Sequence, residues 1–364
     1  MKKSRSAFAA MSLVAALAAG DASADTFAYV ANADSNDVRV FHVEPTSGEI
    51  KPVETVPFPG VEKPGSSTPL AVSPDQQLLF AGVRSEPYTV LSFAIDSKSG
   101  RLTYRGRGPL ADSMANIATD RTGKFLFSAS YGGNRVAMNP IGDDGIVGAP
   151  TQVIPTGLNA HAFLPSPDNH FVFATNLGSD QILGFRFDAA RGMLTPNEPV
   201  ATKVAEKNGP RHFVFHPNGK FVYLVNELSA ALLVFSYDAA RGTWQQIQQA
   251  SALPDGFGGK PWAADIHLAP DGRFLYASER GSNTISAFRV DAESGRVTPI
   301  GSVPTEKQPR GFAIDPSGRL LIAVGELSNA MSIYAIDPAS GALKLLQSIS
   351  VGKKPNWVEF VSFN

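Results

Sequence analysis

The sequence predicts an all-β fold, a seven-bladed β-propeller with four antiparallel strands in each blade. Three observations support this prediction. Long stretches of helical periodicity are nearly absent, one turn phrase recurs seven times at intervals of 45 to 53 residues, and the two ends of the chain read as complementary parts of one repeat. Four short strands in a unit of about 40 to 50 residues are typical of a propeller blade. The 33 Gly and 27 Pro residues fit a folded chain that is rich in turns.

The recurring phrase consists of an acidic or turn residue, a small-residue turn, a glycine and an apolar residue. Its glycine is predicted to take the left-handed conformation that a three- to five-residue hairpin with a bulge requires. A second phrase, as in HPNGKFVYLVN, appears six times about 26 residues upstream of such a glycine and predicts an inner strand, a tight turn and a second strand. The seven hairpin glycines are Gly48, Gly100, Gly145, Gly192, Gly242, Gly295 and Gly341.

The two ends of the chain predict how the ring closes. The first unit begins partway through its blade, at Phe27 in FAYVAN, and therefore lacks an inner strand. The C-terminal segment PNWVEFVSF is an inner strand that no blade follows. Pairing of these two parts would complete one blade and remove exposed sheet edges. A sandwich or a β-helix would not predict such complementary ends, and a ring that closes on itself is expected to be a monomer.

Residues 1–24 are predicted to be a secretory signal peptide. A basic start precedes an apolar run at residues 7–19, and Ala-Ser-Ala at residues 22–24 offers a small-residue cleavage site. A transmembrane helix needs about 20 apolar residues, so this run is too short for one. Cleavage after Ala24 would leave residues 25–364 as a single domain without a membrane segment. In a bacterium this domain would be periplasmic, and the absence of cysteine is compatible with that oxidising compartment.

Charge and motifs exclude several classes of function. The formal net charge is −1, and removal of three basic residues and one acidic residue with the leader changes it to −3. A globally basic nucleic-acid binder is therefore excluded. The chain has no cysteine for a thiolate, no His-Glu-x-x-His zinc motif, no Gly-x-Ser-x-Gly elbow and no glycine-rich phosphate loop. The sequence consequently predicts no metal and no cofactor.

Equivalent positions of the repeats predict a polar mouth at one end of the propeller channel. In GPRHFVFHPNGKFVYLVNE, Arg211 opens the inner strand and Glu227 follows the second strand. Hairpin strands are antiparallel, so both residues should lie at the same edge. The residues equivalent to Arg211 are Thr68, Ala115, His161, Ala264, Arg310 and Asn356, and those equivalent to Glu227 are Ala33, Arg84, Tyr131, Leu177, Arg280 and Glu326.

One side of this mouth, from His161 to Arg310, collects an imidazole, guanidiniums and a carboxylate. A single charged residue at a strand end is usually solvated or paired. Several polar groups that converge on a concave mouth indicate a binding site instead. His212 and His216 belong to the same strand region, and we interpret both as structural.

The strings around these residues resemble the family of seven-bladed propeller lactonases, typified by the bacterial 6-phosphogluconolactonase of propeller type and related to the fungal carboxymuconate cycloisomerase. The resemblance covers residues 26–363, and its most specific strings are GPRHFVFHPNGKFVYLVNEL, WAADIHLAPDGRFLYASERG, QPRGFAIDPSGRLLIAVG and SPDQQLLFAGVRSE. By motif, the resemblance implies an active site of His161, Arg211, Glu227 and Arg310. The further candidates for substrate binding are Arg84, Arg280 and, from the WAADIH segment, Asp265 and His267.

The resemblance implies ring opening of a sugar lactone to the aldonic acid by an activated water. Arginine stays protonated, so Arg211 and Arg310 would act as electrostatic clamps. Our hypothesis from the sequence makes Glu227 the general base and His161 the proton donor to the leaving alkoxide. The expected partner is a small lactone, anionic or polyhydroxylated. Because the phosphorylated lactone is cytosolic and export is predicted, the sequence leaves phosphorylation of the substrate open.

Two alternatives remain at this point. A cycloisomerase would use the same residues to protonate a diene acid and close a lactone, with loss of ultraviolet absorbance. A non-catalytic propeller would use its mouth to bind a ligand or a protein. A sugar lactonase would release acid, whereas a binding propeller would turn over little of any lactone.

Overall fold

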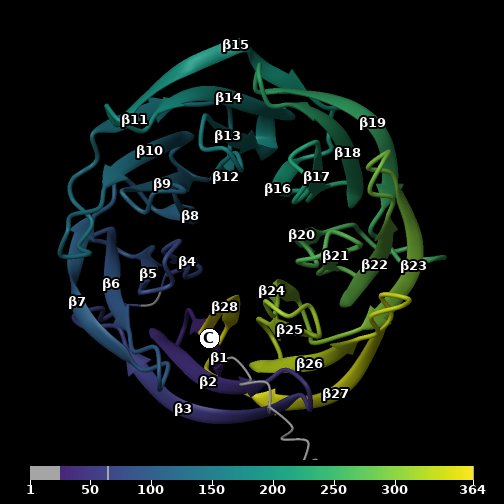
Figure 1. The fold of residues 1–364 in the computed structure, drawn as a ribbon, viewed down its shortest axis with the longest axis horizontal. Coiled ribbons are helices and arrows are strands. Elements are labelled where there is room, and N and C mark those ends of the chain that lie inside the picture. Colours follow the sequence, from purple (N-terminus) through teal and green to yellow (C-terminus); the bar gives the residue numbers. More distant parts are fainter. Residues whose placement is uncertain (1–24, 64, 364) are drawn as a thin grey trace, which may run out of the picture.

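The computed structural model describes residues 25–63 and 65–363, so the predicted signal peptide lies outside the described residues. Seven four-stranded antiparallel sheets surround a central axis, as Figure 1 shows along that axis. This arrangement confirms the seven-bladed propeller. Within the described part of the chain, no helix is long and apolar enough to cross a membrane.

The strands repeat in the same order from the channel outward, with one 3-10 turn, η1 (Leu177–Ser179), after β13. The inner strands are β28 (Pro355–Phe363), β4 (Leu70–Val72), β8 (Met114–Thr119), β12 (Ala160–Pro165), β16 (Pro210–Phe215), β20 (Ala263–Leu268) and β24 (Pro309–Ile314). The second strands are β1 (Asp25–Asn32), β5 (Leu78–Val83), β9 (Phe125–Ser130), β13 (Phe171–Asn176), β17 (Phe221–Asn226), β21 (Phe274–Glu279) and β25 (Leu320–Gly325). The third strands are β2 (Asp37–Glu44), β6 (Thr89–Ile95), β10 (Arg135–Pro140), β14 (Gln181–Asp188), β18 (Ala231–Asp238), β22 (Thr284–Val290) and β26 (Ala330–Ile336). The outer strands are β3 (Glu49–Pro57), β7 (Leu102–Pro109), β11 (Gln152–Pro155), β15 (Met193–Lys203), β19 (Thr243–Ser251), β23 (Val297–Pro304) and β27 (Leu343–Ser350).

The C-terminal strand β28 completes the first blade, as the chain ends predict. It pairs antiparallel with β1, with Thr26 opposite Ser362 and Val30 opposite Val358. The yellow C-terminal strand and the purple N-terminal strand therefore share one sheet in Figure 1. This pairing closes the ring, because β28 covers the inner edge of β1 that would otherwise be exposed.

The hydrophobic core consists of seven clusters, each formed by two adjacent blades. The recurring hairpin glycine helps to hold neighbouring blades together. All seven of these glycines have φ between 60° and 77°, which confirms their predicted left-handed conformation. At Gly295, an added Cβ would lie 2.3 Å from the ring of Phe221 in the preceding blade. The carbonyl of Gly295 also accepts a hydrogen bond from the Tyr223 hydroxyl at 3.0 Å.

The inner strands contain irregularities at the end where the polar mouth is predicted. In β12, β16 and β24 the pairing register shifts close to the start of the strand. Such a bulge adds a residue to one strand and redirects its side chains. The residues within these three shifts include His161, Arg211 and Arg310. Three of the four predicted catalytic residues therefore occupy backbone positions that differ from a regular strand.

Candidate active site

Glu227, which follows β17, accepts hydrogen bonds from three side chains. Its Oε2 lies 2.9 Å from Nε of Arg211 and 2.8 Å from Nη2 of Arg280. Its Oε1 accepts a hydrogen bond from Nε1 of Trp262 at 3.3 Å. Burial raises the pKa of Glu227, but the two guanidiniums outweigh burial and hold this pKa below its ordinary value. The structure thus brings three of the predicted residues together around a stable carboxylate.

Arg211 is among the largest fully buried side chains, with an exposed fraction of 1%. Besides its ion pair with Glu227, it donates from Nη1 to the carbonyl of Ala264 in the next blade. Burial lowers the pKa of Arg211 to about 9, so the guanidinium is charged at neutral pH. A cation fixed in this way can stabilise a developing oxyanion without rearrangement during the reaction.

His161 lies in β12 and is buried, with an exposed fraction of 4%. Its ring centroid is 5.9 Å from that of Tyr131 and 5.0 Å from that of His212. Its Nδ1 is buried and has no hydrogen-bond partner within the described residues. Burial, and then the positive charge of Arg211, hold the pKa of His161 well below its ordinary value. The imidazole is therefore neutral at pH 7, and its protonated form is disfavoured.

Ser67 joins two further guanidiniums, those of Arg84 and Arg310. Its Oγ accepts hydrogen bonds from Nη1 of Arg84 at 2.7 Å and from Nη2 of Arg310 at 3.4 Å. Arg310 also pairs with Glu326 at 3.4 Å, and Nε of Arg84 donates to the hydroxyl of Ser113 at 3.1 Å. Burial, and then the charge of Arg310, lower the pKa of Arg84 to about 10. Two neighbouring cations bridged by a hydroxyl suit an anionic group of a ligand.

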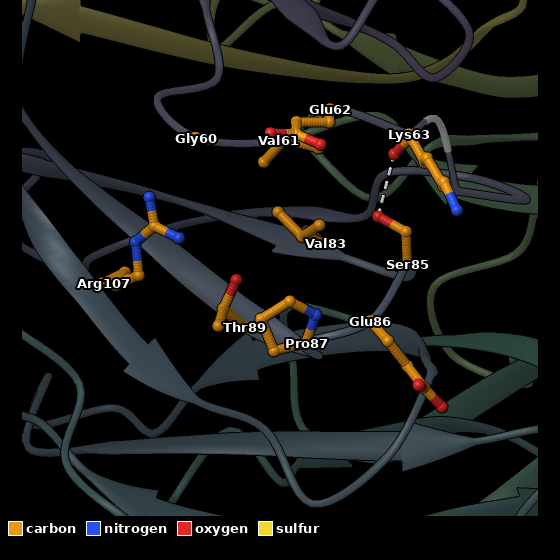
Figure 2. A pocket seen from close by; sticks show the side chains of 10 residues that line it. All are labelled: Gly60, Val61, Glu62, Lys63, Val83, Ser85, Glu86, Pro87, Thr89 and Arg107. Carbon is orange, nitrogen blue, oxygen red and sulfur yellow. Dashed lines mark hydrogen bonds between the residues drawn. The ribbon is translucent and has the colours of Figure 1, made fainter.

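A cavity of about 330 Å³ lies beside the loop that carries Ser67, and Figure 2 shows the side chains that line it. Ser85 donates from Oγ to the carbonyl of Lys63 at 2.9 Å, the dashed line in the figure. Arg107 donates to the carbonyl of Pro59 at 2.6 Å. These bonds tie the loop to its blade. The lining includes none of the four predicted catalytic residues.

Asp265 and His267, two predicted substrate-binding residues, lie further along inner strand β20. Each carboxylate oxygen of Asp265 lies within hydrogen-bond distance of an imidazole: Oδ1 is 2.7 Å from Nδ1 of His212, and Oδ2 is 3.2 Å from Nε2 of His267. All three residues line a channel cavity of about 320 Å³, together with Trp357 and Glu359 of β28. Asp265 therefore connects His267 with His212, a residue that the sequence analysis interprets as structural.

Trp262 and Ser67 are site residues that the repeat comparison does not identify. Trp262 ends the long connection between β19 and β20, and the guanidinium of Arg280 lies 4.1 Å from the centroid of its ring. Its backbone N–H donates to the buried carboxylate of Glu279, and its carbonyl accepts from Nε of Arg280 at 3.1 Å. The indole is thereby fixed beside Glu227 while 38% of the residue stays exposed. Both residues lie in loops outside the recurring phrases, where the period holds no information.

The arrangement supplies the groups that hydrolysis of an ester requires. A neutral imidazole can take a proton from water, and fixed guanidiniums can stabilise negative charge on a carbonyl oxygen. These side chains can therefore carry out general acid–base and electrostatic catalysis. Within the described residues, no group of three or more His, Asp or Glu side chains is arranged to hold a metal ion.

Comparison with known proteins places these features in a family. Residues 57–360 match the family model described as lactonase, 7-bladed beta-propeller. The chain is 40% identical to a 6-phosphogluconolactonase of Serratia proteamaculans over 288 residues, which cover 79% of this chain and 84% of that protein. A 6-phosphogluconolactonase of Yersinia pestis is 39% identical over 287 residues, covering 79% and 83%.

Two solved structures are similar over nearly the whole described chain. A putative 6-phosphogluconolactonase from Bacteroides fragilis superimposes with a TM-score of 0.84 and 29% identity, covering 93% of this chain and 98% of that one. The periplasmic gluconolactonase PpgL of Pseudomonas aeruginosa gives a TM-score of 0.83 and 29% identity, covering 93% and 100%. Together with the match of the family model, these likenesses show that the chain belongs to the family of seven-bladed β-propeller lactonases.

Proposed function

We propose that this protein hydrolyses a sugar lactone to the open-chain acid at the mouth formed by His161, Arg211, Glu227 and Arg310. The observation on which the proposal rests is a buried imidazole with an unpartnered ring nitrogen in a mouth that also holds fixed guanidiniums. The names of its relatives support a lactone as the substrate, because they include 6-phosphogluconolactonases and a gluconolactonase.

In the proposed mechanism His161 is the general base. This differs from the hypothesis based on the sequence, in which Glu227 is the base and His161 only donates a proton. The Oε2 atom of Glu227 is already bound by Arg211 and Arg280, whereas the ring of His161 has a nitrogen without a hydrogen-bond partner in the described residues. His161 takes a proton from water while the water oxygen bonds to the lactone carbonyl carbon. Arg211 and Arg310 stabilise the oxyanion. The ring C–O bond then breaks, His161 returns the proton to the leaving oxygen, and the acid product ionises and releases one proton.

We further propose that the substrate has an anionic group, which binds near Arg84 and Arg310. Glu227 is shared by Arg211 and Arg280, and Glu326 pairs with Arg310, while the hydrogen bonds of Arg84 go to serine hydroxyls. Arg211, Arg280 and Arg310 thus each have a carboxylate partner within 3.4 Å, whereas Arg84 forms no ion pair in the described part of the chain. A phosphate or a sugar carboxylate matches the remaining positive charge.

A periplasmic location for the protein is part of the proposal. It is supported by the predicted signal peptide at residues 1–24 and by the likeness to a periplasmic gluconolactonase. Export would favour a lactone that is available outside the cytosol. Whether that lactone is phosphorylated therefore becomes the central question for an assay.

The test is acid release by the purified protein from 6-phosphogluconolactone and from unphosphorylated gluconolactone, each corrected for spontaneous hydrolysis. We expect saturable turnover, and we expect Arg84→Gln to raise KM about tenfold for an anionic lactone, in line with the loss of one charged hydrogen bond. Arg101→Gln is the control, because Arg101 forms an exposed pair with Glu54. If the wild-type protein turns over neither lactone, the proposal fails, and a diene acid or simple ligand binding should be tested next.

Trp262→Phe is expected to lower kcat/KM about tenfold. The substitution keeps an aromatic ring near Arg280 but removes the N–H that donates to Glu227, and a hydrogen bond to a charged group contributes roughly 1.5–3 kcal/mol. The control is Trp244→Phe, because Trp244 packs against Phe173 and Phe213 between blades and should affect stability alone. Unchanged kinetics of Trp262→Phe would show that the indole N–H does not position the carboxylate.

A further inference from the structure

A line of polar side chains runs from the candidate active site into the channel. It begins at His161 in β12, continues to His212 in β16 and Asp265 in β20, and ends at His267 and Glu359, all on inner strands that surround the channel in Figure 1. The rings of His161 and His212 are 5.0 Å apart, and Asp265 lies within hydrogen-bond distance of both His212 and His267. The proposed hydrolysis accounts for His161 alone and leaves the rest of this line without a role.

Two buried nitrogens face this line without partners. Nδ1 of His161 and Nε2 of His212 are both buried, and neither has a hydrogen-bond partner within the described residues. If the Nδ1 of His212 donates to the Asp265 carboxylate, its Nε2 is a proton acceptor. This acceptor belongs to the ring that is in edge contact with His161, with the two ring centroids 5.0 Å apart, so it is on the ring next to the buried Nδ1 of His161. A rotation of either ring would bring an N–H at Nδ1 of His161 toward this acceptor.

The mechanism gives such a connection a purpose. When His161 takes a proton from water, its positive charge arises in a buried site beside Arg211, His212, Arg310 and Arg280, and positive charge on any of these groups disfavours it. That surrounding makes the protonated state costly, because burial and like charges both disfavour it. The carboxylate bound to the neighbouring ring of His212 is Asp265, at 2.7 Å, whereas Glu227 is shared by two guanidiniums.

We propose that His212 and Asp265 are positioning residues that stabilise the protonated state of His161 during lactone hydrolysis. One ring nitrogen of His161 takes the proton from water and returns it to the leaving ring oxygen when the C–O bond breaks, while the N–H of the other ring nitrogen is directed toward His212, whose own N–H is held by Asp265. No other bond changes, and no further reactant is needed. The inference rests on the proposed function, because it assigns the unit that supports its base. An imidazole held by a carboxylate is a well-known device for raising basicity and fixing the tautomer.

The two histidines beside Asp265 keep its carboxyl group ionised. Burial raises the pKa of Asp265, but His267 and His212 outweigh burial and keep this pKa well below its ordinary value. Burial lowers the pKa of His267, but Asp265 and Glu359 together outweigh burial and raise this pKa above its ordinary value. Glu359, which accepts a hydrogen bond from Trp357 at 2.8 Å, has its pKa raised to about 7 by burial. Asp265 is thus an anion at neutral pH, as the proposed role requires.

Asp265→Asn tests the inference through kcat, KM and the pH profile. We expect kcat to fall at least about tenfold while KM stays within about twofold, because the lost carboxylate supports the base and does not touch the substrate. We also expect the acidic limb of kcat/KM to move to lower pH, because loss of a nearby negative charge disfavours protonated His161. The matched control is His216→Gln, which removes another buried histidine, one that bonds the carbonyl of Gly272 and the backbone N–H of Asn218 outside the line.

A second variant and a spectroscopic measurement separate this inference from the lactonase proposal. His212→Gln should reproduce the loss of Asp265→Asn, and the double variant should lose little more, since the two residues act as one unit. Nitrogen NMR of the wild-type histidines should show His212 as the Nδ1–H tautomer. In Asp265→Asn this tautomer should no longer be fixed, and the measurement needs no turnover. An Nε2–H tautomer of His212, or additive losses with an unchanged acidic limb, would overturn the inference even if the protein is a lactonase.

Discussion

Replacement of His161 by Gln is expected to lower kcat for lactone hydrolysis by about 10²–10⁴-fold, the usual contribution of a positioned base. Gln has a similar polar volume but cannot take up a proton. His161 is buried and contacts Tyr131 and His212 through its ring faces and edges, so some loss of stability is expected as well. Measurement of kcat and KM at a temperature far below unfolding separates the two effects.

The pH dependence of the wild-type protein adds an independent check on His161. A base must be deprotonated to work, and burial together with Arg211 holds the pKa of His161 well below its ordinary value. Activity should therefore persist as the pH falls through the range where a solvent-exposed histidine becomes protonated, and decline only at lower pH. A profile that declines with the pKa of an unperturbed histidine, about 6.5, would contradict a buried neutral base at this position.

The contrast between regular and irregular parts of the repeat explains what could be predicted from the sequence. The seven hairpin glycines and the complementary chain ends follow from local turn chemistry and from edge pairing, and the structure agrees with both. The position of Arg211 opposite Glu227 follows from the antiparallel geometry of one hairpin, and the two side chains do form an ion pair.

Other features of the site depend on contacts that no period describes. A bulge at the start of β16 allows two neighbouring residues to reach the site: Arg211 contacts Glu227, and His212 contacts Asp265. In a regular strand the side chains of neighbouring residues would point to opposite faces. Ser67 and Trp262 reach the mouth from long loops, and the length of a loop does not determine where its last side chain points. In the sequence, only the position of His212 directly after Arg211 in GPRHF could have indicated that it belongs to the site. Side chains of a regular strand alternate between its two faces, however, so only one of two neighbours is expected to face inward.

Glu227→Gln is expected to produce the largest combined loss of stability and activity. The substitution keeps the shape of the side chain and removes its charge, so the buried guanidiniums of Arg211 and Arg280 lose their shared counter-ion. Breaking a buried ion pair from one side typically costs about 3–5 kcal/mol, because the remaining charge is left uncompensated. Chemical denaturation measures this loss as a change in the free energy of unfolding, and Glu54→Gln, which removes the partner of the exposed Arg101, should cost less than about 1 kcal/mol.

The kinetics of Glu227→Gln decide which of the two residues is the base. If Glu227 mainly fixes the guanidiniums, its loss lowers kcat through a displaced oxyanion clamp, and the acidic limb that belongs to His161 remains in the pH profile. If Glu227 takes the proton from water, the limb disappears in Glu227→Gln and survives in whatever activity His161→Gln retains. Full activity of Glu227→Gln would exclude both roles, because neither a base nor the shared counter-ion of two catalytic cations can be removed from this site without loss of rate.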